Sequence, residues 1–160
     1  MAVDETATLT AFLDFHRSTL ARKCEGLTDD QLRLRSVPPS ALSLLGLVRH
    51  MAEVERFWFR SILLGTEFTT GLYSTEAEPD GDFDQVDTAD VAADFATWRA
   101  EIDAARRAAA GLPLDTVGKR LRHGREVTLR WILAHMVEEY ARHNGHADLL
   151  REAVDGSTGE

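Results

Sequence analysis

Apolar residues recur at three- and four-residue intervals in four segments of the chain. These segments span residues 4–25, 40–64, 88–110 and 128–154. This period places the apolar residues on one face of a helix, so it predicts four long helices. Ser40 or Ser43, Thr88 and Thr128 are suitable N-caps, and a glycine follows each of the first three segments. Four long helices in one chain predict an all-α fold, a four-helix bundle.

The connection between the second and third predicted helices, residues 66–87, is long and acidic. It contains seven acidic residues and no basic residue, so we expect it to be irregular and exposed. The run from Asp80 to Asp84 begins like a calcium-binding loop, but Gln85 and Val91 stand where that loop needs Gly and a bidentate Glu. We therefore interpret the run as a solvated acidic loop. A link of this length permits helices two and three to run parallel.

Residues 116–127 alternate in polarity around His123 and Gly124. This pattern predicts a small β-hairpin before the fourth helix. A short helical turn capped by Thr28 is expected after the first helix. We expect one domain over residues 1–154 and a flexible tail over residues 155–160.

Polar residues interrupt two of the apolar stripes. On the fourth helix, Glu139, His143 and His146 fall on the same side as Ile132 and Leu150, because each residue advances the helix by about 100°. A carboxylate and imidazoles buried without partners cost several kcal/mol, so the stripe requires something that satisfies them.

The second helix supplies a matching residue. His50 lies on the apolar face that Leu47 and Val54 define, whereas Glu55 falls at the margin of that face or outside it. His50, Glu139 and His143 would make a two-His, one-carboxylate set. Three protein ligands with open positions are typical of a catalytic metal site. A buried hydrogen-bonded network without metal is the alternative interpretation.

Nitrogen and carboxylate ligands without thiolate suit zinc, and also iron(II), nickel or manganese. Zinc is the default expectation because it is common and needs no redox partner. His146 lies roughly 10 Å along the axis from Glu139, so we expect it in a second shell, facing substrate, or bonded in the core. His135 is an alternative ligand at the edge of the stripe. His16 lies on the apolar face of the first helix, where it lines the cavity or is satisfied in the core.

Composition excludes several classes of function. The net charge of −9 among 160 residues argues against nucleic acid or an anionic membrane surface as the main partner. The single Cys24 rules out an internal disulfide and fits a reducing, cytoplasmic environment. We see no signal peptide, and no apolar run reaches the roughly 20 residues of a membrane span.

Two segments resemble a known family. SLLGLVRHMAEVERFWF (residues 43–59) and LRWILAHMVEEYARHNGHADLLRE (residues 129–152) are similar to the DinB/YfiT-like superfamily, most of all to its actinobacterial mycothiol-transferase branch. The resemblance implies a bundle with up-down-down-up topology and a divalent metal. It implies that His50 and His143 are ligands, with Glu139 in place of the usual middle His. The same His, Glu, His set is similar to that of mycothiol-dependent maleylpyruvate isomerases, whereas many relatives have Gln at the position of His146.

The resemblance favours a metal-dependent thiol S-transferase as the function. The metal would hold mycothiol or a similar thiol as thiolate, and the thiolate would attack a small electrophile. Two alternatives stay open: a metal-dependent hydrolase of a small amide or ester, and a non-enzymatic bundle that binds a ligand or partner. A homodimer is also consistent with the pattern, because periodicity does not assign Trp58, Phe59 and Trp98 to one core.

Overall fold

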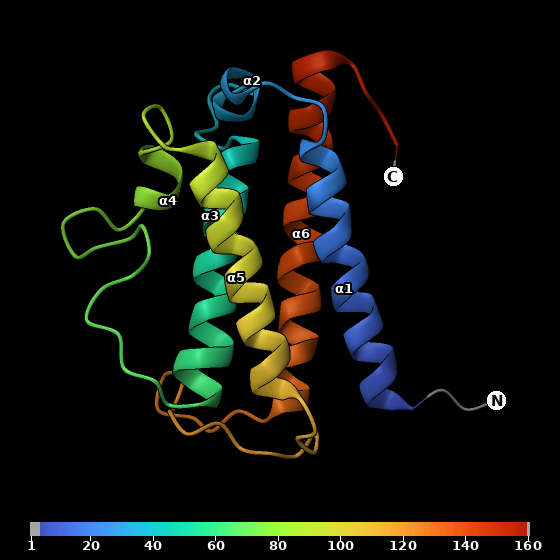
Figure 1. Ribbon diagram of the computed structural model, residues 1–160, viewed down its shortest axis with the longest axis vertical. Coiled ribbons are helices and arrows are strands. Elements are labelled where there is room, and N and C mark those ends of the chain that lie inside the picture. Colours follow the sequence, from blue (N-terminus) through green and yellow to red (C-terminus); the bar gives the residue numbers. More distant parts are fainter. Residues whose placement is uncertain (1–3, 160) are drawn as a thin grey trace.

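Four long helical segments lie side by side in the computed structural model, which describes residues 4–159 (Figure 1). They are α1 (Glu5–Cys24), α3 (Leu44–Glu55) with the π-helix η1 (Arg56–Leu63) that continues it, α5 (Val91–Ala109) and α6 (Leu129–Asp155). The short helices α2 (Asp29–Arg33) and α4 (Gly81–Asp84) lie in the connections. The described residues contain no β-strand, which confirms the prediction of a mostly helical chain.

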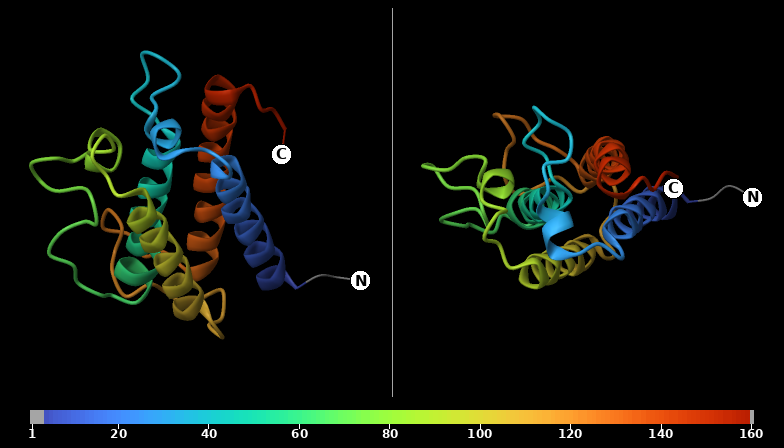
Figure 2. Two further views of the ribbon diagram at one scale, coloured as in Figure 1. Left: turned by 45° about the horizontal axis from the view of Figure 1, so that its top comes forward. Right: turned by 90° about the horizontal axis from the view of Figure 1, so that it is seen from above.

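The long segments differ in direction. In Figure 1, α1 and α6 run upward, whereas α3 with η1 and α5 run downward. Helix α1 packs against α6, and α3 packs against α5. Seen from above in Figure 2, the four segments surround a common centre. The connection between η1 and α5 returns the chain to the top of the molecule, and this return lets the two segments run in the same direction.

Side-chain caps fix where the long helices begin. Ser43 Oγ accepts a hydrogen bond from Gly46 N at 3.1 Å, so Ser43 and not Ser40 is the N-cap of α3. Thr128 caps α6 as predicted. The prediction that Thr88 caps the third helix is wrong, because Asp90 accepts from Ala93 N at 3.0 Å. The Ala89 N–H donates to Val86 O, which keeps this stretch in a turn for two further residues.

The predicted β-hairpin at residues 116–127 is not confirmed. The tight turn at His123 and Gly124 is present, with φ of 50° and 75°, but only isolated β-bridges flank it. The backbone N–H groups of Lys119 and Arg120 donate to carbonyls at the end of η1 instead. The segment therefore pairs with η1 through Lys119 and Arg120, and with itself only at isolated positions such as Arg122 and Arg125.

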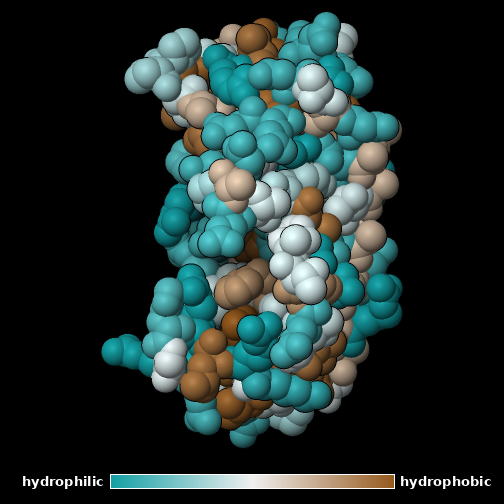
Figure 3. Space-filling view, turned by 90° about the vertical axis from the view of Figure 1, so that its left-hand side faces the viewer, coloured by the Kyte–Doolittle hydropathy of each residue, from teal (hydrophilic) through white to brown (hydrophobic). Residues whose placement is uncertain are grey.

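The acidic connection is only partly solvated. Figure 3 shows the side of the molecule that carries it, which is largely hydrophilic with apolar residues gathered toward the lower end. Asp82, however, is 5% exposed. The Arg49 guanidinium donates to the backbone carbonyls of Gly81 and Asp82, each at 3.0 Å. The interpretation of the whole run as a solvated loop is therefore wrong at Asp82, because an arginine on α3 holds α4 against the helices.

A buried polar network lies at the centre of the molecule. Glu55 is fully buried, and Arg17 Nε and Nη2 each donate to its carboxylate at 2.7 Å. Tyr140 Oη donates to Glu55 at 2.8 Å, and Trp98 Nε1 donates to Tyr140 Oη at 2.9 Å. The expectation that Glu55 lies at the margin of the apolar face or outside it is therefore wrong. These four residues come from the four long segments, so the network links all of them.

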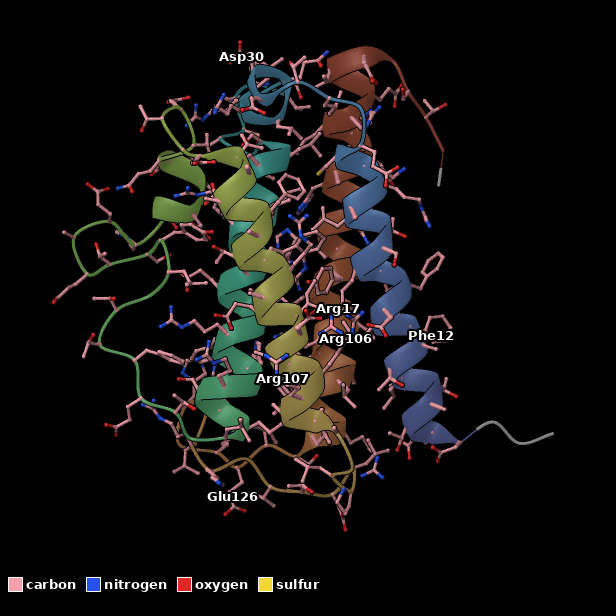
Figure 4. The ribbon with its side chains drawn as sticks, viewed as in Figure 1. Phe12, Arg17, Asp30, Arg106, Arg107 and Glu126 are labelled. Carbon is pink, nitrogen blue, oxygen red and sulfur yellow. The ribbon has the colours of Figure 1, made fainter. Side chains whose placement is uncertain are left out.

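The aromatic residues that suggested a dimer are buried within one chain. Trp58, Phe59 and Trp98 are all 5% exposed or less. The wider turn of the π-helix η1 lets the consecutive Trp58 and Phe59 both enter the core. Phe12 of α1, by contrast, is exposed, and Figure 4 shows it directed away from the helices whereas Arg17 points in among them. The positions of these aromatic residues are therefore explained within one chain, without a dimer.

A glycine cap marks the end of the last long helix. Helix α6 ends at Asp155, and Gly156 follows as a left-handed C-cap. The predicted domain (residues 1–154) and tail (residues 155–160) include residues 1–3 and 160, which lie outside the described residues. No helix in the described part of the chain is long and apolar enough to cross a membrane.

The central network predicts that two carboxylates paired with Arg17 contribute unequally to the stability of the protein. Glu55→Ala should lower the free energy of unfolding by about 3–5 kcal/mol, because it leaves the Arg17 guanidinium buried without a counter-charge. Urea denaturation followed by circular dichroism measures this loss. Asp14→Ala is the matched control: Asp14 also pairs with Arg17, at 3.0 Å, but it is half exposed and should cost less than about 1 kcal/mol. Equal losses in the two variants would contradict the account.

Candidate metal centre

Three predicted ligand residues converge between α3 and α6. His50, Glu139 and His143 each offer a ligand atom, and these atoms all lie within 4.8 Å of one another. Glu139 and His143 are one helical turn apart, with His143 Nε2 3.4 Å from Glu139 Oε2. The His50 and His143 rings approach to 4.7 Å between centroids. The structure thus brings together the residues that the two interrupted stripes singled out.

Asp82 orients the His50 ring. Its Oδ2 lies 2.8 Å from His50 Nδ1, and its backbone carbonyl accepts from the buried Arg49. An Nδ1–H that donates to this carboxylate leaves His50 Nε2 with its lone pair free toward the other two residues. A carboxylate behind a histidine in this way fixes the tautomer and raises the basicity of a metal ligand. Phe83 stacks on the ring at 5.1 Å and limits its rotation.

His143 is prepared for ligation in a similar way. Its Nδ1 lies 3.3 Å from His146 Nδ1. In the tautomer that carries the proton on His143 Nδ1, this proton is shared with His146 and Nε2 is free to bind a metal ion. Burial, together with the neighbouring His50 and His146, lowers the pKa of His143 to about 4. The imidazole is therefore neutral at pH 7, the form that binds a metal ion.

The surroundings of Glu139 fit a cation. Its side chain is 16% exposed, and its nearest basic groups are His135 Nε2 and His143 Nε2, each 3.4 Å from one of its oxygens. Within residues 4–159 no group donates a hydrogen bond to this carboxylate. A mostly buried carboxylate that accepts no hydrogen bond gains most from a positive ion. Two histidines and one carboxylate suit zinc, nickel, iron(II) or manganese.

A cavity of about 1100 Å³ opens beside these residues. His50, Asp82 and Glu139 line one part of it, and an aromatic wall and three residues of the turn, Arg122, His123 and Arg125, line another. The aromatic wall consists of Phe57, Trp58 and Trp131. A volume of this size exceeds the roughly 300–1,000 Å³ of common small-molecule sites, so the cavity has room for more than one small ligand.

The other three predicted histidines lie in three different places. His135 lies on the wall of the cavity, stacked on Trp131 at 4.9 Å, and with Glu138 and Glu139 it forms a second, more exposed group. His146 contacts His143 and sits behind it. His16 is not part of the centre. It lines a separate hollow between α1 and the end of α6, where its carbonyl accepts from Asn144 at 3.0 Å.

Asp82 is the site residue that the sequence did not reveal. The only indication in the sequence is the Asp-Gly-Asp-Phe run. It begins like a calcium-binding loop but lacks two of the residues such a loop needs, so from the sequence we interpret it as a solvated loop. Its contact with His50 joins positions 32 residues apart, which no local pattern encodes.

These features define a class of protein: a helical protein in which two histidines and one carboxylate could hold a metal ion beside a cavity. The chain belongs to the mycothiol-S-transferase family, whose model matches residues 8–156. This match confirms the resemblance to the mycothiol-transferase branch, and it includes every residue of the centre. No curated protein matches the chain.

The Asp82 contact generates a prediction about metal affinity. Asp82→Ala should weaken metal binding about 10–100-fold, because His50 loses the partner that fixes its tautomer. Competition with a chromogenic chelator measures the affinity. Asp84→Ala is the matched control: Asp84 lies in the same short helix but is exposed, so its affinity should match the wild type. An unchanged affinity in Asp82→Ala would show that the contact does not orient a ligand.

Proposed function

We propose that this protein is a mycothiol S-transferase that depends on a divalent metal held by His50, Glu139 and His143. The convergence of these three side chains at the edge of the cavity is the observation that carries the proposal. Membership of the mycothiol-S-transferase family supports a low-molecular-weight thiol as one substrate. We further propose that the four long segments form an up-down-down-up four-helix bundle, in which the metal joins α3 to α6.

Zinc is the ion we propose, because the donor set suits it and the reaction needs no redox change. When bound, the ion stabilises the thiolate form of a thiol at neutral pH. The chain's own residues prepare the site for it. Asp82 and His146 hold the two imidazoles with their Nε2 atoms free, and the low pKa of His143 keeps that ring unprotonated.

The reaction class follows from the chemistry of a thiolate. The thiol gives its proton to solvent, its sulfur forms a bond to an electrophilic carbon, and the leaving group departs with the electrons of the broken bond. The cavity holds both reactants, and its aromatic wall contacts the apolar part of the second one. Room for two molecules favours a transferase over a hydrolase, which needs only one substrate and water.

Elemental analysis of the purified protein followed by a mycothiol-conjugation assay tests the proposal. The wild type should contain about one zinc or similar ion per chain and should conjugate the thiol to a reactive electrophile. His50→Ala and His143→Ala should each lose the metal and at least about 100-fold in activity, because two ligands do not retain the ion at a catalytic site. His16→Ala, in its separate hollow, is the control and should retain both.

Three results would contradict the proposal. Metal content and activity that survive in both ligand variants would place the chemistry elsewhere. Turnover of esters or amides without any thiol would favour a hydrolase. A metal-free protein whose melting temperature does not respond to chelators would favour a bundle that only binds a ligand or partner.

A further inference from the structure

Two arginines flank the tight turn that borders the cavity. Arg122 N donates to Arg125 O at 2.9 Å, and Arg125 N donates to Arg122 O at 3.0 Å. Residues paired in this way across a two-residue turn project their side chains to the same side. That side is the cavity, which both arginines line. The positive φ of His123 and Gly124 fixes the turn and therefore the placement of the pair.

Neither guanidinium is paired with a carboxylate. Across residues 4–159, no acidic oxygen lies within 4.0 Å of Arg122 or Arg125, although the chain carries an excess of nine negative charges. Arg122 instead rests against two aromatic rings, with its Cζ 5.3 Å from the centroid of Phe57 and 5.8 Å from that of Trp58. Stacking on aromatic rings holds the guanidinium in place. Its Nη1 lies 3.5 Å from His123 Nδ1, and its remaining N–H donors are available to a ligand.

An apolar surface leads from this pair to the metal centre. The Trp58 ring contacts both Trp131, at 5.0 Å, and His135, at 4.7 Å between centroids. His135 Nε2 is in turn 3.4 Å from a Glu139 oxygen. The cavity therefore has three parts in order: a cationic end, an aromatic middle and the His and Glu residues of the centre.

The acidic residues of the cavity do not occupy or cancel the cationic end. Asp82 accepts from His50. Glu53 Oε1 accepts from the backbone N–H groups of Tyr73 and Ser74. Asp80 and Glu126 are exposed, so water screens their charge.

We propose that Arg122 and Arg125 form an anion subsite and that the electrophile is an apolar molecule with a carboxylate at one end. This inference rests on the proposed transferase function and names the class of its second substrate. The carboxylate accepts hydrogen bonds from the two guanidinium groups, and the apolar body lies along Phe57, Trp58 and Trp131. The reactive carbon at the opposite end then faces the centre where the thiol sulfur is held.

Binding of 2-naphthoate and of its neutral analogue 2-naphthamide tests this subsite without any thiol. Tryptophan fluorescence reports binding, because Trp58 and Trp131 line the cavity. The zinc-loaded wild type should bind the carboxylate about tenfold more tightly than the amide, as expected for charge-assisted hydrogen bonds. Arg122→Gln/Arg125→Gln should remove this preference and leave amide binding unchanged. Arg107→Gln, an exposed arginine on α5 labelled in Figure 4, is the control and should behave as the wild type.

Two outcomes would overturn the subsite: no preference in the wild type, or a preference that persists in the double variant. A preference that chelation abolishes while the arginine substitutions do not would show that the metal binds the carboxylate. If the double variant is unfolded, Arg125→Gln alone gives the same test, because its side chain is exposed. Thiol conjugation is measured separately, so a protein that prefers the carboxylate but transfers no thiol would overturn the proposed function and leave the subsite standing.

Discussion

The buried carboxylate of Glu55 is the contact on which the arrangement of the candidate site depends. It accepts from Arg17 of α1 and Tyr140 of α6, and Tyr140 accepts from Trp98 of α5. A buried carboxylate is costly unless every lone pair finds a donor, so the helices have few other ways to pack. Glu55 is five residues from His50, and Tyr140 follows Glu139 directly. The hydrogen bond that joins α3 to α6 therefore also sets the register that brings His50 to Glu139.

A second restraint holds the outer side of the centre. Arg49 precedes His50 on α3, so the two side chains point about 100° apart. Arg49 is directed to Asp94 of α5, at 3.0 Å, and to the carbonyls of α4. This contact brings Asp82 onto His50. Arg49 therefore fixes the acidic connection against the helices, whereas the next residue, His50, faces the cavity.

The sequence predicted the parts of this account that depend on local periodicity. The helical repeat located the four long segments, and polar residues inside apolar stripes indicated His50, Glu139 and His143. Contacts between distant segments were not predictable. Glu55 is buried because side chains of α1 and α6 donate hydrogen bonds to it. Asp82 is buried because an arginine on α3 donates a hydrogen bond to its backbone carbonyl. The expected hairpin is not confirmed, because the backbone N–H groups of Lys119 and Arg120 donate to carbonyls of η1 and only isolated β-bridges join the two sides of the turn.

The central claim is that His50, Glu139 and His143 hold the metal on which thiol transfer depends. Anomalous diffraction from crystals grown with zinc, collected on both sides of the zinc absorption edge, tests this claim directly. The account predicts one strong peak within bonding distance of His50 Nε2, His143 Nε2 and a Glu139 oxygen. A peak at the neighbouring group of His135, Glu138 and Glu139, or no peak at full zinc loading, would contradict it.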